Sequence, residues 1–136
     1  MSAAGQRPVV LDTSALLYWT LRPEALTKRA RAAIAAALPS AGCVVSAISR
    51  WAIGLKMKQG RPTIGMSVEE FADRLATVSG LEIAPVGVPI WLRNLALPWA
   101  HRDPADRTIV ATADLLGARL VTSDREIGAY YSRTVW

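Results

Sequence analysis

The chain has 136 residues, and this length predicts one domain spanning residues 1–136. Its 51% hydrophobic and 20% charged residues supply enough apolar surface to form a core, which excludes an intrinsically disordered chain. The net charge of +5 favours polyanionic partners without identifying one. The charge is also uneven, because residues 1–68 carry nine basic and two acidic side chains whereas residues 69–136 carry seven and nine.

Short apolar runs alternate with helical patterns along the whole chain. We expect strands at residues 8–12, 43–46, 81–84, 119–122 and 132–135, and helices at about residues 14–19, 24–38, 47–59, 68–78, 89–97, 104–117 and 125–130. This order predicts an α/β fold with three layers, in which helices flank both faces of a central parallel sheet of about five short strands. Trp51 and Trp91 stand at helical spacing among aliphatic residues, so we expect both in the core.

The compartment is predicted from what the sequence lacks. Pro39 interrupts the longest uncharged stretch, residues 32–49, so we expect no membrane span. We also expect no secretion signal, because the first apolar cluster, residues 9–11, is followed at once by Asp12. Cys43 is the only cysteine and stands in an apolar run, so it forms no intramolecular disulfide and is expected to be buried. We therefore predict a cytoplasmic protein.

Three aspartates lie where ligands gather in a parallel sheet, beyond the carboxyl ends of its strands. Asp12 follows the first strand, Asp124 follows the fourth, and Asp106 opens the helix that leads into the fourth. Each one alone is better explained as a helix-capping or first-turn acid. Together, carboxylates at adjacent strand ends repel one another unless a cation lies between them. Oxygen ligands favour Mg²⁺ or Mn²⁺, which suits phosphate chemistry.

Four segments carry a family resemblance that covers nearly the whole chain. They are residues 9–17 (VVLDTSALL), 45–53 (VSAISRWAI), 101–107 (HRDPADR) and 120–124 (LVTSD). In order and spacing they resemble a PIN domain, and in particular the VapC-type toxins of bacterial toxin–antitoxin pairs. Any one segment alone is weak, and four in register make the resemblance specific.

The resemblance implies a small α/β endoribonuclease in which the strand ending at Asp12 lies beside the strand near Asp124. It implies that Asp12, Asp106 and Asp124 are metal ligands for Mg²⁺ or Mn²⁺ and that Thr122 or Ser123 supplies a supporting hydroxyl. It also implies an RNA substrate, a homodimer, and a cognate VapB-type antitoxin whose chain end blocks the acidic site.

One residue departs from the family pattern. A Glu normally follows the tryptophan of the second segment, and here that position is Ala52. The acid was either lost naturally or replaced deliberately to disarm a toxic nuclease, and the intact surrounding motif favours replacement. Because the missing carboxylate weakens attraction for a cation, we expect little or no cleavage by this chain. If Ala52 is natural, the alternative is a non-catalytic module that binds RNA or an antitoxin.

Basic residues accompany the second segment. Arg50, Lys56, Lys58 and Arg61 are either a solvated helix face or a rim that follows an RNA backbone. His101 is the only histidine, and without a Ser or Cys nucleophile arranged around it we expect it to form hydrogen bonds in a loop rather than to act as a general acid.

Overall fold

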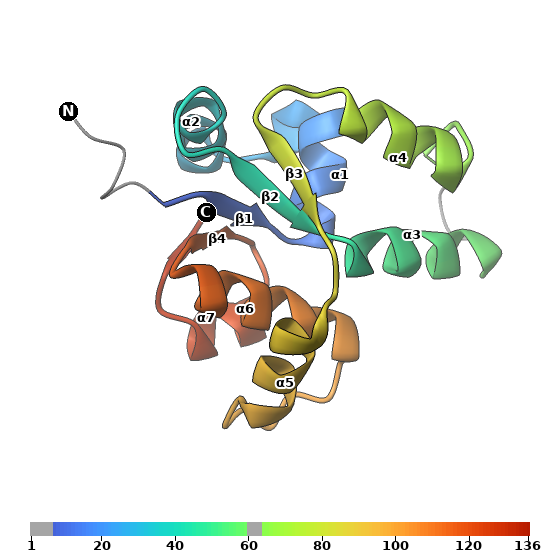
Figure 1. Cartoon of the computed structure of the whole chain (residues 1–136). Coiled ribbons are helices and arrows are strands. Elements are labelled where there is room, and N and C mark those ends of the chain that lie inside the picture. The colour runs from blue at the N-terminus through green and yellow to red at the C-terminus, as the bar shows by residue number, and fades with distance from the viewer. Residues whose placement is uncertain (1–6, 60–63) are drawn as a thin grey trace.

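A computed structural model describes residues 7–59 and 64–136, which form a parallel sheet covered by helices (Figure 1). The strands have the order β3-β2-β1-β4-β5. They are β1 (Val9–Leu11), β2 (Cys43–Ser46), β3 (Leu81–Ala84), β4 (Arg119–Val121) and β5 (Thr134–Val135). The helices are α1 (Thr13–Leu21), the 3₁₀ helix η2 (Pro23–Ala25), α2 (Lys28–Ala37), α3 (Ile48–Lys58), α4 (Val68–Ala76), α5 (Val88–Ala96), α6 (Pro104–Leu116) and α7 (Arg125–Tyr130).

Two hydrophobic clusters lie on opposite faces of this sheet. Successive side chains of a strand point to opposite faces, so Val9 and Leu11 pack with α1, α2 and α4 whereas Val10 packs with α6 and α7. The central strand β1 is covered on both sides, and Val10 and Leu11 have no solvent exposure. This confirms the expected parallel sheet of about five strands between helical layers, and Cys43 is buried as expected.

The predicted long helix over residues 24–38 is wrong. The chain forms η2 and then α2, because Leu26 is extended and Thr27 begins a new helix. The Thr27 hydroxyl accepts a hydrogen bond from the Ala30 amide at 3.1 Å, which caps α2. The alanine-rich sequence favours a helix throughout, and this local cap sets where α2 starts.

The longest helix is instead α6, which leads into β4. Asp103 caps its first turn by accepting a hydrogen bond from the Asp106 amide at 3.0 Å. Gly117 ends it in the left-handed conformation, with φ of 60°, where a Cβ is unfavourable. These two ends set the position of Asp106 and the start of β4, and thereby fix both relative to the sheet.

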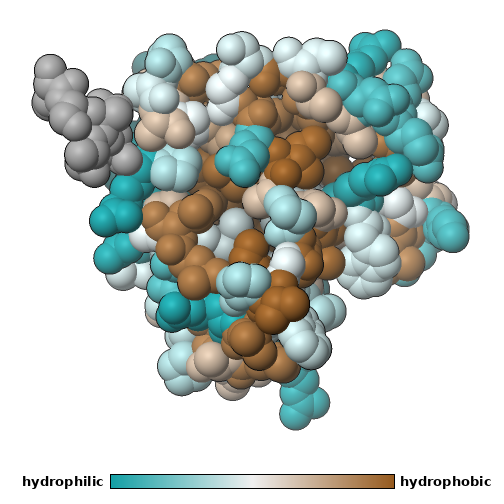
Figure 2. Space-filling view, viewed as in Figure 1, coloured by the Kyte–Doolittle hydropathy of each residue, from teal (hydrophilic) through white to brown (hydrophobic). Residues whose placement is uncertain are grey.

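Trp51 and Trp91 correct another prediction. Both were expected in the core, but they are 53% and 57% exposed. Apolar residues at helical spacing are buried only where another element covers them, and no element covers these faces of α3 and α5 within the described residues. Figure 2 shows a broad apolar area over the part of the molecule where α5 lies in Figure 1. No helix in the described ranges combines the length and apolar character needed to cross a membrane.

Candidate functional site

Asp12 and Thr122 lie at the carboxyl ends of the neighbouring strands β1 and β4. Leu11 is paired with Val121, so the next residue of each strand emerges at the same edge of the sheet. The Thr122 hydroxyl donates a hydrogen bond of 2.5 Å to Asp12 Oδ2, and the Ala15 amide donates to Asp12 Oδ1 at 2.7 Å. Asp12 is only 6% exposed. Its carboxylate is therefore held rigidly at the sheet edge, and the expected adjacency of these two strands is confirmed.

Asp124 is tied to the same hydroxyl through its backbone. Its amide donates to Thr122 Oγ1 at 3.0 Å, and its side chain accepts from the Ile127 amide at 3.0 Å and so caps α7. Of the two hydroxyls considered from the sequence, Thr122 is the one that contacts Asp12, whereas Ser123 is exposed.

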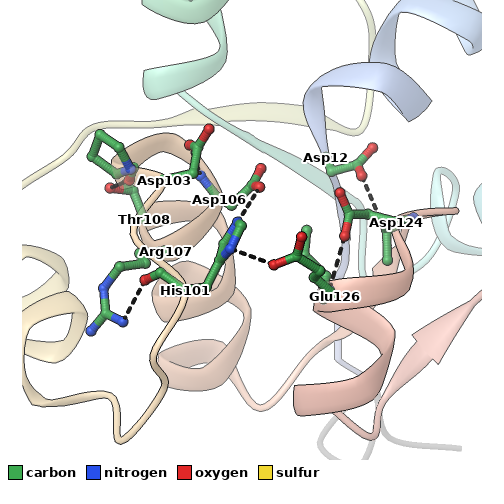
Figure 3. Close-up of polar contacts among 11 residues, drawn as sticks. Asp12, His101, Asp103, Asp106, Arg107, Thr108, Asp124 and Glu126 are labelled. Carbon is green, nitrogen blue, oxygen red and sulfur yellow. Dashed lines mark hydrogen bonds and ion pairs between the residues drawn. The ribbon is translucent and has the colours of Figure 1, made fainter.

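Asp106 enters the site from the first turn of α6. Its Oδ2 lies 2.8 Å from His101 Nε2, and the other ring nitrogen of His101 lies 2.7 Å from Glu126 Oε2 (Figure 3). The prediction that His101 forms hydrogen bonds in a loop is confirmed. Glu126 was missed by the sequence analysis, because an acid in the first turn of α7 looks like ordinary helix-dipole stabilisation.

The three aspartates interact electrostatically. Burial raises the pKa of Asp12 above its ordinary value, and the charges of Asp106 and Asp124 raise it further against the effect of its hydrogen bonds. Burial is also the main cause of the raised pKa of Asp106, to which Asp124 contributes, while the hydrogen bond to His101 opposes it. No Arg or Lys in the described ranges forms an ion pair with any of the three. The basic group that contacts the cluster is instead His101, which lies against Asp106.

His101 has a raised pKa, chiefly because of its hydrogen bond to Asp106 and also because of the charge of Glu126. A neutral imidazole has one N–H, so it donates to only one of two carboxylates, whereas the protonated ring donates to both. The geometry of His101 therefore fits the charged ring.

The donor chemistry of this cluster fits a hard divalent cation, because carboxylate and hydroxyl oxygens are the ligands that Mg²⁺ and Mn²⁺ prefer. The present side-chain orientations do not converge on a single point. Across residues 7–59 and 64–136, no group of three or more His, Cys, Asp or Glu side chains is arranged to hold a metal ion. Each carboxylate instead accepts from protein donors.

Ala52 lies on α3, near the same edge of the sheet. The hydroxyls of Ser49 and Thr13 are hydrogen bonded at 2.9 Å, which joins the start of α3 to the residue after Asp12. Ala52 is half-buried and stands three residues after Ser49, on the same face of the helix. A longer side chain at this position starts about one helical turn from the Ser49–Thr13 hydrogen bond.

Two of the basic residues of α3, Arg50 and Lys58, line a groove. The groove has a volume of about 760 Å³ between α3 and α4, and Arg50, Trp51, Lys58 and Glu69 are among the residues that line it. Arg50 is 3.9 Å from Glu69, and both side chains are largely exposed. Lys56 and Lys58 are exposed in the last turn of α3, and Arg61 lies outside the described residues.

Arg107, in the third segment, binds backbone carbonyl groups and does not line the groove. The Arg107 guanidinium donates to the carbonyl oxygens of Asn94, Leu97, Trp99 and His101. These contacts fasten the loop between α5 and α6 onto α6, and they fix the backbone of His101.

Fold, sheet order and acidic edge together define a PIN-like protein, and comparison with known proteins agrees. The chain matches the PIN domain family over residues 9–132 and belongs to that family. It is 34% identical over 134 residues to Ribonuclease VapC22 of Mycobacterium tuberculosis, a match that covers 94% of this chain and 98% of the relative. A toxin–antitoxin complex from Klebsiella pneumoniae superposes with a TM-score of 0.62 at 21% identity, covering 94% of this chain and 96% of that one. The latter likeness shows the shared fold.

Proposed function

We propose that this PIN-domain chain is a VapC-like endoribonuclease toxin of a toxin–antitoxin pair, weakened by alanine at position 52. The observation that carries the proposal is that Asp12, Asp106 and Asp124, from three separate segments, lie near enough to one another to interact electrostatically. The 34% identity to a protein named as a ribonuclease supports the same activity.

In this proposal Asp12, Asp106 and Asp124 hold Mg²⁺ or Mn²⁺. An ion held by these residues would supply Lewis acidity, which would favour a hydroxide nucleophile and offset negative charge on the phosphodiester. Thr122 keeps Asp12 in place through its hydroxyl and also accepts the amide of Asp124, so one side chain orients two of the acids. Arg50, Lys56, Lys58 and Arg61 offset the repulsion between the acids and an anionic RNA backbone.

Position 52 limits the activity. The Ser49 to Thr13 hydrogen bond supports a site for a fourth carboxylate beside Asp12, and alanine supplies none. Fewer negative charges attract a cation less strongly, and no acid is present there to orient the attacking water. We therefore expect weak metal binding and little cleavage by this chain.

The proposal includes protein partners as well as RNA. One structural neighbour is a toxin–antitoxin complex, which supports an antitoxin as a partner. We propose that this antitoxin is of the VapB type and that the pair acts in the cytoplasm. A homodimer is supported by α5, whose exposed Val88, Trp91, Leu92 and Leu95 are unusual on a monomer. The chain functions in this proposal as one PIN-like domain.

The test is RNA cleavage by this chain and by its Ala52→Glu variant, each with Mg²⁺ and with EDTA. We expect Ala52→Glu to raise the cleavage rate at least 100-fold in Mg²⁺ and to have no effect in EDTA. Ala76→Glu, at the end of α4, is the matched control because it adds the same charge away from the acidic cluster. Equal cleavage by the parent and Ala52→Glu chains contradicts the assigned role of position 52.

The second candidate is a non-catalytic module that binds RNA or an antitoxin. Ala52 and the absence of converging ligands in the described part of the chain favour this alternative. A Mg²⁺ titration followed by NMR distinguishes the two, because a binding module has no reason to show shifts confined to the residues around Asp12, Asp106 and Asp124. Such shifts, together with Mg²⁺-dependent cleavage by Ala52→Glu, exclude the module.

A further inference from the structure

The three acids of the proposed site are oriented by different means. Asp12 is held by Thr122 and the Ala15 amide, and Asp124 is held by the Ile127 amide of its own helix. The Asp106 carboxylate makes no such contact to the backbone. Among the described residues, the hydrogen-bond partner of its side chain is His101.

His101 is itself fixed from several sides. Its ring packs on Trp99, with the centroids 4.7 Å apart, and Trp99 stacks on Tyr130 of α7 with centroids 4.8 Å apart and planes within 9°. The carbonyl oxygens of Trp99 and His101 both accept from Arg107. These contacts hold the imidazole in place in the loop before α6, and only 17% of the His101 side chain is exposed.

The geometry points to His101 as a positioning residue that bridges Asp106 on α6 to Glu126 on α7 and thereby fixes the direction of the Asp106 carboxylate. The bridge uses Asp106 Oδ2 and leaves Oδ1 available to a ligand. Glu126 acts through His101, because its Oε2 lies 2.7 Å from the second ring nitrogen and so favours this orientation of the ring. In this assignment His101 touches no reacting atom. The orientation of Asp106 follows from the contacts, whereas its effect on metal binding rests on the proposed function.

Two consequences follow for the proposed metal site. A carboxylate that is already oriented loses less conformational freedom when it binds a cation. Removal of the hydrogen-bond partner of a ligating group typically weakens metal binding about 10- to 100-fold. We therefore expect His101→Ala to weaken Mn²⁺ binding to the Ala52→Glu chain by about 10- to 100-fold. His101→Gln, which keeps a side-chain N–H, should recover part of this loss.

A metal-free measurement tests the geometry itself. Three-bond couplings of the Asp106 side chain, recorded by NMR in EDTA, should report one χ1 rotamer in the parent and averaged rotamers in His101→Ala. Because His101 is the only histidine, its ring nitrogens are assigned without ambiguity, and Glu126→Gln should shift the Nδ1 resonance. Arg102→Ala is the matched control, since Arg102 is the exposed neighbour in the same loop.

The two measurements separate the inference from the proposed function. A single Asp106 rotamer in His101→Ala overturns the positioning role. So does Mn²⁺ binding that is as tight in the Ala52→Glu chain carrying His101→Ala as in the Ala52→Glu chain alone. Averaged rotamers together with no Mn²⁺ binding by Ala52→Glu support the positioning role and refute metal ligation. Averaged rotamers together with weakened Mn²⁺ binding, partly recovered by His101→Gln, support both.

Discussion

The sheet edge around Asp12 and the outer surface of α5 depart from the usual distribution of side chains in opposite directions. Asp12 and Thr122 are polar and are 6% and 3% exposed, whereas Val88 and Leu95 are apolar and are 63% and 67% exposed. Buried polar groups and exposed apolar groups are the informative exceptions in a folded protein. In the proposed function, the first region binds a divalent cation and the second contacts another protein surface.

The two regions also differ in how complete they are. At the sheet edge both oxygens of Asp12 have donors, so the burial of this carboxylate is partly compensated within the chain. On α5 the apolar side chains have no cover within the described residues, and each remains in contact with water. The contribution of the first region to stability depends on charge and therefore on pH. Association through the second region depends on the protein concentration.

The largest expected effect comes from Asp12→Asn, which removes the charge of the buried carboxylate at the sheet edge. In the Ala52→Glu chain we expect this change to lower Mg²⁺-dependent RNA cleavage at least 100-fold, because a ligand is lost. The metal-free parent chain should become more stable at pH 7. Asparagine fits the same two contacts, since its oxygen accepts from the Ala15 amide and its amide group donates to Thr122 Oγ1.

The pH dependence gives the sign of the stability effect. The pKa of Asp12 is raised in the folded state, so the folded chain binds more protons than the unfolded chain in the interval above the ordinary pKa. Stability therefore falls as pH rises through that interval, and Asp12→Asn removes this fall. Melting temperatures should be higher by a few degrees at pH 7 and equal near pH 3. Asp73→Asn, an exposed acid on α4, should change neither, and an Asp12→Asn chain less stable than the parent at pH 7 contradicts the argument.

Most of the sheet was predictable from the sequence, because strands that are covered on both faces consist of short, continuous apolar runs. Residues 43–46 and 81–84 form strands with the predicted bounds. The break at Leu26 and Thr27 was not predictable, since it depends on a local cap within an alanine-rich stretch. The exposure of Trp91 was also missed, because periodicity states which residues share a helix face and not whether that face is covered.

The candidate site was predictable only in part. Position relative to the strands identified Asp12, Asp124 and Asp106, and the family resemblance implied their role as metal ligands. The link from Asp106 through His101 to Glu126 joins segments that no sequence spacing connects. It depends on the side-by-side placement of α6 and α7, which the tertiary fold determines.

Trp91→Glu tests the exposed apolar surface of α5, and its effect on self-association should be the second largest. If α5 meets a second copy of the chain, a charge in the middle of that contact leaves a desolvated carboxylate unpaired. We expect the dimer dissociation constant, measured by sedimentation, to rise about 10- to 100-fold, in line with about 1.4 kcal/mol per tenfold change.

The control for α5 is Leu21→Glu, an exposed leucine at the end of α1. It should leave association unchanged, and neither substitution should alter the melting temperature of the dilute monomer by more than a degree or two, because both side chains already contact water. A parent chain that sediments as a monomer at all concentrations removes α5 as a self-association surface.

The smallest expected effect concerns the groove between α3 and α4, which combines features of both regions. It is lined by apolar Trp51 and by Arg50 and Lys58, and Arg50 lies 3.9 Å from Glu69. An exposed ion pair of this kind contributes about 0–1 kcal/mol, so Arg50 gives up little by leaving Glu69 for a phosphate. Lys58 has no ion-pair partner among the described residues and is free to contact RNA directly.

Lys58→Ala should therefore weaken binding of a single-stranded RNA a few-fold in EDTA. It should also reduce the slope of log affinity against log salt by roughly 0.7, the change expected for one phosphate contact. Glu69→Gln should strengthen binding slightly, because it releases Arg50, whereas Glu82→Gln on β3 should not. Fluorescence anisotropy at several salt concentrations measures all three variants. If the slope is the same with and without Lys58, these charges form only a solvated helix face, and the RNA path must lie elsewhere on the molecule.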